Sequence, residues 1–435
     1  MGSIPAPSPL LLELAEATLA SAKRLDEGLA AEGLPQPSFA ADGPVYVVTK
    51  TTSKEVQDAR TAVAEAAFQL FQLVTGPSEL LPNITASYHT IFALQWLHQF
   101  NVFSHVPLEG TVTYDTLAFK AQVPESLLKG VARMAMTSKI LAEPKPGHVA
   151  HTASSAMFHK APNMRDWASY MFRASIPTAA AMVRATEKWP GSVKKTETAY
   201  NIAFDHSLPF FDHLSQSPEM TAQFSGYMKS VTDGQGMDLA HLVNGFDWLS
   251  LPEGSLVVDI GGSTGHASHA VAAAYPHLSF EVQDLDAVVN GKKTTAVSDD
   301  SESTSRVCFK AHSFFEPQTT TGAAVYMLRM IIHDWPDAEA TNILSNLVPA
   351  LKAGKSTLLI MDTVLPSPGV LPSVRERVIR TRDLTMRQVF NARERDLDDW
   401  KALLKAADPR LELKSVRQPE GSNMSLLEIG LDPIS

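Results

Sequence analysis

The chain has 435 residues, of which 44% are hydrophobic and 19% charged, a composition typical of a folded globular protein with room for two or three domains. Its net charge of −10 argues against nucleic-acid binding, which needs a concentrated positive surface. With one cysteine, Cys308, the chain can form neither an internal disulfide nor a cysteine-based zinc site.

The first residues carry no targeting signal that we recognise. Residues 1–20 lack the basic segment and the long apolar run of a signal peptide, and no later segment is apolar enough to cross a membrane. We therefore expect a cytoplasmic protein with neither a membrane nor a nucleic acid as its partner.

Helical periodicity dominates the first part of the chain. The spacing of apolar residues predicts helices over residues 9–32 and 53–74, the second capped by Ser53. The glycine and prolines of residues 75–83 are expected to end the second helix. This apolar arm is equally suited to packing on a second subunit or on its own chain.

Residues 84–160 follow the order helix, helix, helix, hairpin, which is the pattern of a winged helix. DNA binding must therefore be weighed. The candidate recognition helix offers only Lys129, Arg133 and Lys139, in an acidic protein. A structural or dimer-forming role is the better interpretation.

From about residue 205 strands and helices alternate, which predicts a doubly wound, mostly parallel sheet. Cys308 is expected to be a buried strand residue, and the polar segment 297–306 to be an exposed loop. The predicted strands cover residues 255–260, 278–284, 306–312, 323–332, 356–362, 411–418 and 424–431.

A glycine-rich loop, Gly261 to Gly265, follows the first of these strands and precedes a helix. Glycines let a ligand approach the backbone closely, but the spacing is neither that of a dinucleotide fold nor that of a P-loop. Asp259, just before the loop, suits a ligand with an ammonium group. Asp284 ends the next strand, where a carboxylate can accept hydrogen bonds from a ribose.

His333 lies between an apolar run read as the end of a buried strand and a polar Asp-Trp-Pro-Asp turn. It is a candidate base, metal ligand or core histidine. A metal ligand is disfavoured because no second histidine or acid lies nearby at a ligand spacing, so we expect no metal site. A core position is the default interpretation for a lone histidine.

Five motifs in a fixed order resemble one enzyme family: DIGGSTG, VQDLDAVV, MIIHDWPD, LLIMDTVLP and NARERDLDDW. They are similar to the S-adenosylmethionine-dependent O-methyltransferases of the small-molecule (caffeate/hydroxyindole) type, in the version found in fungal secondary metabolism. The resemblance implies an α/β fold in which residues 206–435 form a Rossmann-like, doubly wound catalytic domain. Residues 1–205 would form a mostly helical, winged-helix dimerisation domain, and the enzyme would be a homodimer acting on a small hydroxylated molecule.

The resemblance also assigns the cofactor contacts. Gly261 and Gly265 would line the methionine part of S-adenosylmethionine, and Asp284 would bind its ribose. Family members usually have Asp-Met or Asp-Phe at the adenine, whereas this chain has Ser313 and Phe314. A serine can accept this contact without charge assistance, so we expect weaker cofactor binding.

By the same resemblance His333 would be the general base, with Asp362 and Glu394 behind it. A phenol has a pKa of about 10 and histidine about 6.5, so proton transfer before attack costs roughly 5 kcal/mol. Nearby carboxylates reduce this cost by raising the histidine pKa. Arg329 would meet the cofactor or be a solvated strand residue.

The remaining candidates concern the acceptor. Asp334 would either contact it or cap the next helix. Apolar pocket positions of the family correspond to Phe224, Met228 and Met386, although at helical spacing such residues are more often part of the core. His159 would reach the pocket from the N-terminal domain, as would His151, although a core role is favoured for both histidines.

Two other functions compete with O-methylation. Some proteins of this fold catalyse dehydration or pericyclic reactions and keep the cofactor as a bound cation, often with Arg or Lys at the base position. The presence of His333 favours methyl transfer. A winged-helix regulator, the non-enzymatic alternative, would bind DNA at physiological salt and would not depend on His333.

Overall fold

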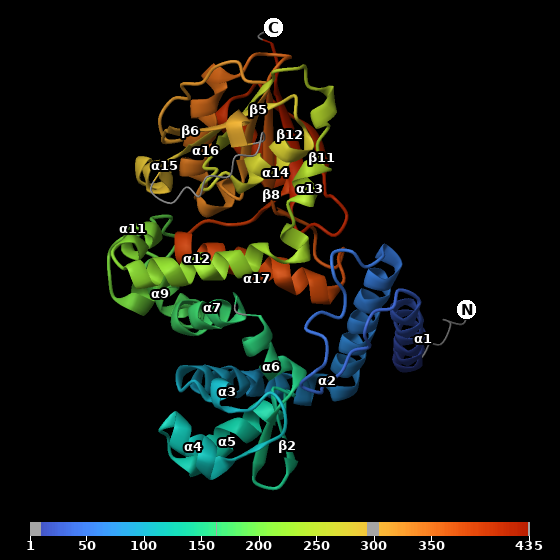
Figure 1. Cartoon of the computed structure of the whole chain (residues 1–435). Helices are drawn as coiled ribbons and strands as arrows, with labels where there is room; N and C mark the ends of the chain where they lie inside the picture. The colour runs from blue at the N-terminus through green and yellow to red at the C-terminus, as the bar shows by residue number, and fades with distance from the viewer. Residues whose placement is uncertain (1–9, 162, 294–303, 434–435) are drawn as a thin grey trace, which may run out of the picture. The chain divides into compact units, whose positions relative to one another are not determined.

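The computed structural model describes residues 10–161, 163–293 and 304–433 (Figure 1). Within them the chain forms two compact units. The first comprises residues up to Ala174 with Glu219–Ser230 and Pro372–Glu376, and the second comprises the remainder. Residues 297–303 of the predicted polar loop lie outside the described residues.

The first unit is mainly helical. Helix α1 packs along α2, and three short strands form a sheet in the order β1-β3-β2 with antiparallel pairing. Its elements are α1 Leu10–Ala31, α2 Lys54–Gln99, α3 Val102–His105, β1 Val112–Thr113, α4 Tyr114–Ala121, α5 Glu125–Met136, β2 Leu141–Lys145, β3 His148–His151, α6 Ala153–Lys160 and α7 Asn163–Tyr170.

The predicted interruption between residues 75 and 83 is wrong in extent. Helix α2 runs through it, and only Gly76 leaves helical geometry, with φ 65° and ψ 169°. Pro77 then begins a new helical segment at once, because proline is tolerated in the first turn, where its missing N–H would have no partner. The result is a kink at Gly76 and not a loop.

The second unit contains a seven-stranded sheet in the order β11-β12-β8-β7-β4-β5-β6. Strands β8 to β6 in this order are parallel, whereas β12 runs antiparallel to both of its neighbours, β8 and β11. This sheet and the helical first unit confirm the predicted α/β class. The strands are β4 Leu256–Ile260, β5 Ser279–Asp284, β6 Val307–Ala311, β7 Val325–Arg329, β8 Thr357–Asp362, β11 Leu411–Arg417 and β12 Ser425–Leu431.

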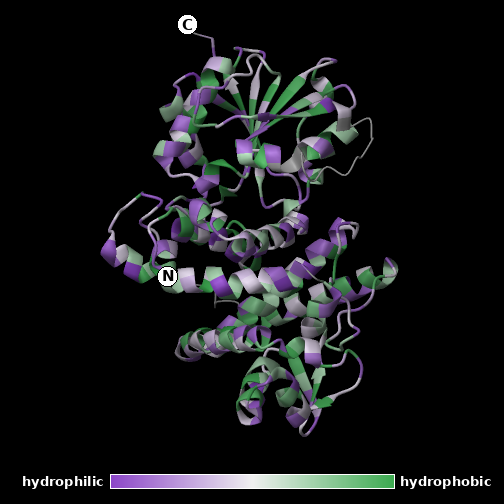
Figure 2. Ribbon diagram, turned by 60° about the vertical axis from the view of Figure 1, so that its left-hand side comes forward, coloured by the Kyte–Doolittle hydropathy of each residue, from purple (hydrophilic) through white to green (hydrophobic). Residues whose placement is uncertain are grey.

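Apolar side chains pack on both faces of this sheet, as its buried strands require. Figure 2 colours the strands largely as hydrophobic. Leu358 and Ile360 of β8 pack with helices α16 and α18, whereas Leu359 and Met361 point to the other face, beside α14. The accompanying elements are α8 Ile176–Ala180, α9 Met182–Lys188, α10 Ala199–Phe204, α11 Phe210–Ser215, α13 Ala240–Val243, α14 His266–Ala274, α15 Asp286–Lys293, α16 Asp337–Leu347, β9 Val364–Leu365, β10 Arg395–Asp396 and α18 Leu397–Ala407.

Helices α12, Pro218–Thr232, and α17, Ser373–Phe390, contribute residues to both units. Among the described residues no helix has the length and apolarity needed to span a membrane.

Two details of the predicted strands are wrong. The strand expected over residues 323–332 ends at Arg329, because Met330 adopts a left-handed conformation with φ 57°. His333 therefore lies on a short 3₁₀ turn, Ile332–Asp334, one step beyond the strand. Cys308 is exposed and not buried, because β6 is the edge strand of the sheet.

Candidate active site

The strand order reverses between β4 and β7, which are parallel neighbours at the centre of the sheet. Open α/β sheets bind ligands at such a position. The glycine loop follows β4, and the turn with His333 follows β7. The sheet therefore brings the two strongest motifs of the sequence to one edge.

His333 lies against two carboxylates. Its Nδ1 is 3.0 Å from Glu394 Oε1 and 3.2 Å from Asp362 Oδ1, and its backbone N–H donates to Asp362 Oδ2 at 3.3 Å. Ionised carboxylate oxygens only accept hydrogen bonds, so Nδ1 must carry a hydrogen. Nε2 is then the nitrogen that can take up a proton, and it lies 3.6 Å from Asp334 Oδ1.

Both carboxylates behind His333 are almost fully buried, with 0% of Asp362 and 1% of Glu394 exposed. Burial alone would lower the pKa of His333, but the charges of Asp362, Glu394 and Asp334 outweigh it and raise that pKa to about 10. For Asp362 burial acts in the opposite direction. It raises the pKa of this carboxyl group to about 6, although the charge of His333 lowers it. The imidazolium is thus strongly stabilised by its surroundings.

The same three groups could hold a metal ion, since one ligand atom from each lies within 4.8 Å of the others. The spacing argument against a metal at His333 therefore fails in three dimensions, because Asp362 and Glu394 come from distant parts of the chain. Among the described residues this is the single such cluster.

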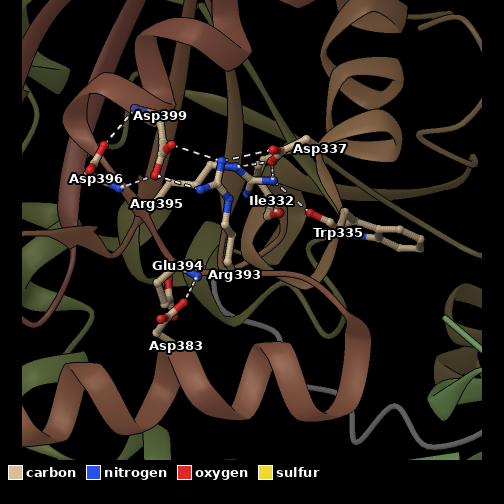
Figure 3. A network of polar contacts seen from close by, with 9 residues as sticks. All are labelled: Ile332, Trp335, Asp337, Asp383, Arg393, Glu394, Arg395, Asp396 and Asp399. Atoms are coloured by element: carbon tan, nitrogen blue, oxygen red, sulfur yellow. Dashed lines mark hydrogen bonds and ion pairs between the residues drawn. The ribbon is translucent and has the colours of Figure 1, made fainter. Parts of the chain in front are cut away.

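Arg395, which the sequence reasoning did not single out, holds the turn Ile332–Asp334 in place (Figure 3). Its buried guanidinium donates to the carbonyl oxygens of Ile332 at 3.0 Å and Trp335 at 2.9 Å, the residues flanking His333 and Asp334. It also forms an ion pair with Asp337 at 2.7 Å. Since Arg395 follows Glu394 directly, one short segment fixes both the turn and the carboxylate that contacts His333.

We call the contacts of Arg395 with Ile332, Trp335 and Asp337 the clamp, and a second layer of polar contacts surrounds it (Figure 3). Arg393 pairs with Asp337 and Asp399, each at 3.0 Å. The backbone N–H of Glu394 donates to Asp383 Oδ1 at 3.1 Å, which ties the segment to α17. The orientation of Glu394 is thus set by the hydrogen bond of its backbone N–H and by the contacts of its neighbours, Arg393 and Arg395.

The glycine loop has the close packing that a ligand-binding loop needs. Gly261 and Gly265 have φ 71° and 72°, which disfavours residues with a side chain. A Cβ on Gly265 would lie 2.9 Å from Phe309, and one on Gly262 would lie 2.6 Å from the Asp259 carboxyl group. Gly262 is a position that the sequence reasoning missed.

The two predicted acids around this loop lie in different surroundings. Asp259 is buried under the loop, where its Oδ2 accepts a hydrogen bond from Ser268 at 2.6 Å, and burial raises its pKa to about 6. Asp284 accepts a hydrogen bond from the backbone N–H of Ser263 at 2.8 Å. Asp284 therefore joins β5 to the loop, while contact of either acid with the cofactor stays a prediction.

Three further cofactor candidates lie in the same unit. Ser313 Oγ accepts from the backbone N–H of Phe315 at 3.3 Å, and the Phe314 ring packs edge-on against Trp335. Arg329 is not a solvated strand residue: its guanidinium donates to the Met237 carbonyl at 3.0 Å, and its Nε is buried with no hydrogen-bond partner in the described part of the chain. These groups suit a polar nucleoside ligand.

The acceptor candidates are divided between the units. Asp334 does not cap the next helix, because α16 begins at Asp337 with Pro336 at the N-cap. Met386 lies in α17, in the part that belongs to the second unit. Phe224, Met228 and His159 belong to the first unit. Their contacts with an acceptor stay predictions.

The two N-terminal histidines make hydrogen bonds within their own unit. His159 Nε2 lies 3.0 Å from the Phe103 carbonyl. His151 is buried, with Ser155 and the Val106 carbonyl as partners, and burial lowers its pKa to about 4. For His151 these contacts agree with the core role that the sequence favours.

Comparison with known proteins matches this chain to the O-methyltransferase domain family over residues 190–408. O-methyltransferase aurJ of Gibberella zeae is 72% identical over 437 aligned residues, covering 99% of both chains. Among solved structures, OxaC superposes with a TM-score of 0.76 at 21% identity, covering 97% of this chain and 99% of its own. The complex of LepI with SAM gives a TM-score of 0.70 at 22% identity, with coverages of 86% and 95%. The two structures share the fold.

We expect Arg395→Met to destabilise the protein and to lower activity. The substitution leaves the Ile332 and Trp335 carbonyls without their buried donor, at a cost of about 3 kcal/mol. Arg393→Met is the matched control, because Arg393 shares the partner Asp337 but is 34% exposed, and it should cost less than about 1 kcal/mol. Urea unfolding followed by circular dichroism measures both, and equal losses would contradict the clamp.

Proposed function

The chain belongs to the O-methyltransferase family, and from that premise we propose that it methylates a hydroxyl group of an aromatic, polyketide or pyridone-type secondary metabolite, with His333 as general base. The observation that carries the proposal is the contact of His333 Nδ1 with two buried carboxylates, 3.0 and 3.2 Å away. Fungal relatives named as O-methyltransferases support methyl transfer to an oxygen atom.

S-adenosylmethionine is the cofactor, and when bound it supplies a methyl group on a positively charged sulfonium. Gly261 and Gly265 would expose backbone to its methionine part, and Asp284 would accept from its ribose. Ser313 and Phe314 would border the adenine, and Arg329 and Asp259 would complete the polar wall. The left-handed glycines and the partnerless Nε of Arg329 fit such a ligand.

His333 would accept the hydroxyl proton at Nε2. Its Nδ1 would keep its own hydrogen, which faces the carboxylates of Glu394 and Asp362. A fixed tautomer aims the proton-accepting nitrogen away from the carboxylates. The acceptor oxygen would gain electron density as its proton leaves, and its hydrogen passes to His333. Asp334, 3.6 Å from Nε2, would contact the acceptor or its leaving proton.

The raised pKa decides how effective this base is. A phenol has a pKa of about 10, and that of His333 is raised to about 10, so the difference that costs roughly 5 kcal/mol for an ordinary histidine nearly disappears. The matched pKa has a consequence, because below pH 10 most His333 already carries the proton in the free enzyme. Activity should therefore grow as the pH rises and the neutral form becomes more abundant.

A dehydratase or pericyclase that keeps the cofactor as a bound cation is the second candidate. The superposition on a solved structure described as "A Pericyclic Reaction enzyme", with a TM-score of 0.71, supports this candidate. In this chain the base position carries His333, backed by two acids, which favours proton removal over polarisation of a carbonyl.

We predict that His333→Gln lowers methyl transfer by about 10²- to 10⁴-fold, the usual contribution of a general base. Glutamine keeps much of the shape but cannot accept a proton. The measurement is label transfer from methyl-labelled S-adenosylmethionine to a panel of phenols and hydroxypyridones, with cofactor affinity by calorimetry as the control. Unchanged transfer would overturn the base assignment, and cofactor-dependent conversion of an unsaturated substrate without transfer would support the second candidate.

The pH dependence gives a second prediction. In wild type, kcat/KM should rise with pH through neutrality, since the raised pKa of His333 keeps it protonated at lower pH. Glu394→Gln removes one of the charges that raise this pKa, so the rising limb should move to lower pH by about one unit. A limb that stays in place would instead report the ionisation of the acceptor.

We further propose that the enzyme is a homodimer built on an arm of the first unit, which consists of α1 and of α2 up to Ile84. The arm carries large apolar side chains that are exposed in the single chain, and burying them would be favourable. They are Leu10, Leu11, Leu12 and Leu19 of α1 and Phe71, Val74, Leu81 and Ile84 of α2.

Sedimentation equilibrium should accordingly give twice the chain mass of 47.2 kDa. Leu81→Lys together with Ile84→Lys should shift the protein towards the monomer, because both side chains are more than half exposed in the single chain. Leu249→Lys, at an equally exposed site of the second unit, is the control and should leave the dimer intact. A wild-type monomer at micromolar concentration would exclude the arm as an interface.

A further inference from the structure

Lys195 lies in the segment between α9 and α10 and points its ammonium group at the aromatic residue that follows the turn Ile332–Asp334. Its Nζ is 2.8 Å from the centre of the Trp335 ring and 6.0 Å from that of Phe390. Ring faces attract cations, so these two contacts favour the charged form. All three residues belong to the second unit.

The ammonium group has no hydrogen bond or ion pair within the described residues. The carboxylates of Asp334, Glu339 and Asp212 act on it only at longer range, and burial lowers its pKa to about 8. The preceding Lys194 is 70% exposed and pairs with Glu197 at 3.0 Å. The two adjacent lysines therefore have opposite surroundings.

A half-buried ammonium without hydrogen-bond partners in the described chain is incompletely satisfied, because ring faces replace part of its water and cannot accept three N–H donors as oxygen atoms do. No side chain or carbonyl of the described chain accepts a hydrogen bond from the ammonium group. The donors are thus available to an oxygen atom from outside the chain, and a charge-assisted hydrogen bond there would be strong.

The position of Lys195 connects it to the reaction. Asp334 lies 3.6 Å from His333 Nε2, and its charge also acts on Lys195. Trp335, whose ring faces the ammonium group, directly follows Asp334 in the chain. An acceptor whose hydroxyl reaches His333 would therefore be bordered by the Lys195 ammonium and by the rings of Trp335 and Phe390.

We propose that Lys195 binds a second oxygen of the acceptor, a carbonyl or anionic oxygen on the same aromatic system as the hydroxyl that is methylated. The inference rests on the proposed function and narrows its substrate class to hydroxyaryl carbonyl compounds and hydroxyaryl acids. The aromatic wall favours a flat ring system, and the ammonium group selects against rings that carry a hydroxyl alone.

Binding in the presence of S-adenosylhomocysteine tests this inference without any methyl transfer. The probes are 1-hydroxy-2-acetonaphthone, which adds a carbonyl, and 1-hydroxy-2-naphthoate, which adds an anion, each compared with 1-naphthol by calorimetry. Wild type should bind at least one of the two about tenfold or more tightly than 1-naphthol, the usual worth of a hydrogen bond to a charged group. The preferred probe identifies the kind of oxygen.

Lys195→Met should abolish this preference and leave 1-naphthol affinity within about twofold, since it keeps the apolar stem and removes the charge. Lys195→Arg should retain the preference, and Lys194→Met, the control, should behave as wild type. No preference in wild type, or a preference that survives Lys195→Met, overturns the inference. Intact preference with no methyl transfer to any acceptor would overturn the proposed function alone.

Discussion

The catalytic unit depends on two buried acids that meet at one nitrogen atom. Asp362 and Glu394 are removed from water, which for an isolated carboxylate costs far more than most folds can offset. His333 offsets that cost as their shared cation, and the backbone N–H of His333 supplies a further donor to Asp362. The site is built from three separate segments, and it leaves Glu394 Oε2 buried without a hydrogen-bond partner among the described residues.

The sheet and one arginine, Arg395, bring His333, Asp362 and Glu394 together. Strands β7 and β8 are parallel neighbours, so the turn after one and the acid at the end of the other reach the same edge. Arg395 then fixes the turn through the carbonyls of Ile332 and Trp335 while its neighbour Glu394 reaches Nδ1. Under the proposed function, stability and catalysis would be coupled here, because the same contacts hold the fold and position His333.

The features of the fold and the site that depend on a local sequence pattern could be predicted. The alternation of strands and helices predicted the sheet, and motif resemblance singled out His333, Asp362 and Glu394, which the structure brings together. Contacts that depend on sheet order escaped prediction: Cys308 looks like a core residue until β6 proves to be an edge. The apolar run past Arg329 hid the end of β7, because a buried turn has the composition of a strand. Lys195 carried no signal at all, since its surroundings come from residues far along the chain.

The most direct test is the protonation of His333 itself. Nuclear magnetic resonance of protein with isotope-labelled histidine, with the His333 signal assigned by its loss in His333→Gln, reports the pKa of this one side chain. The account predicts a pKa raised well above the usual 6.5, so that His333 remains protonated at pH 8, and a lower value in Glu394→Gln. A His333 that titrates at or below 6.5 in wild type would contradict it.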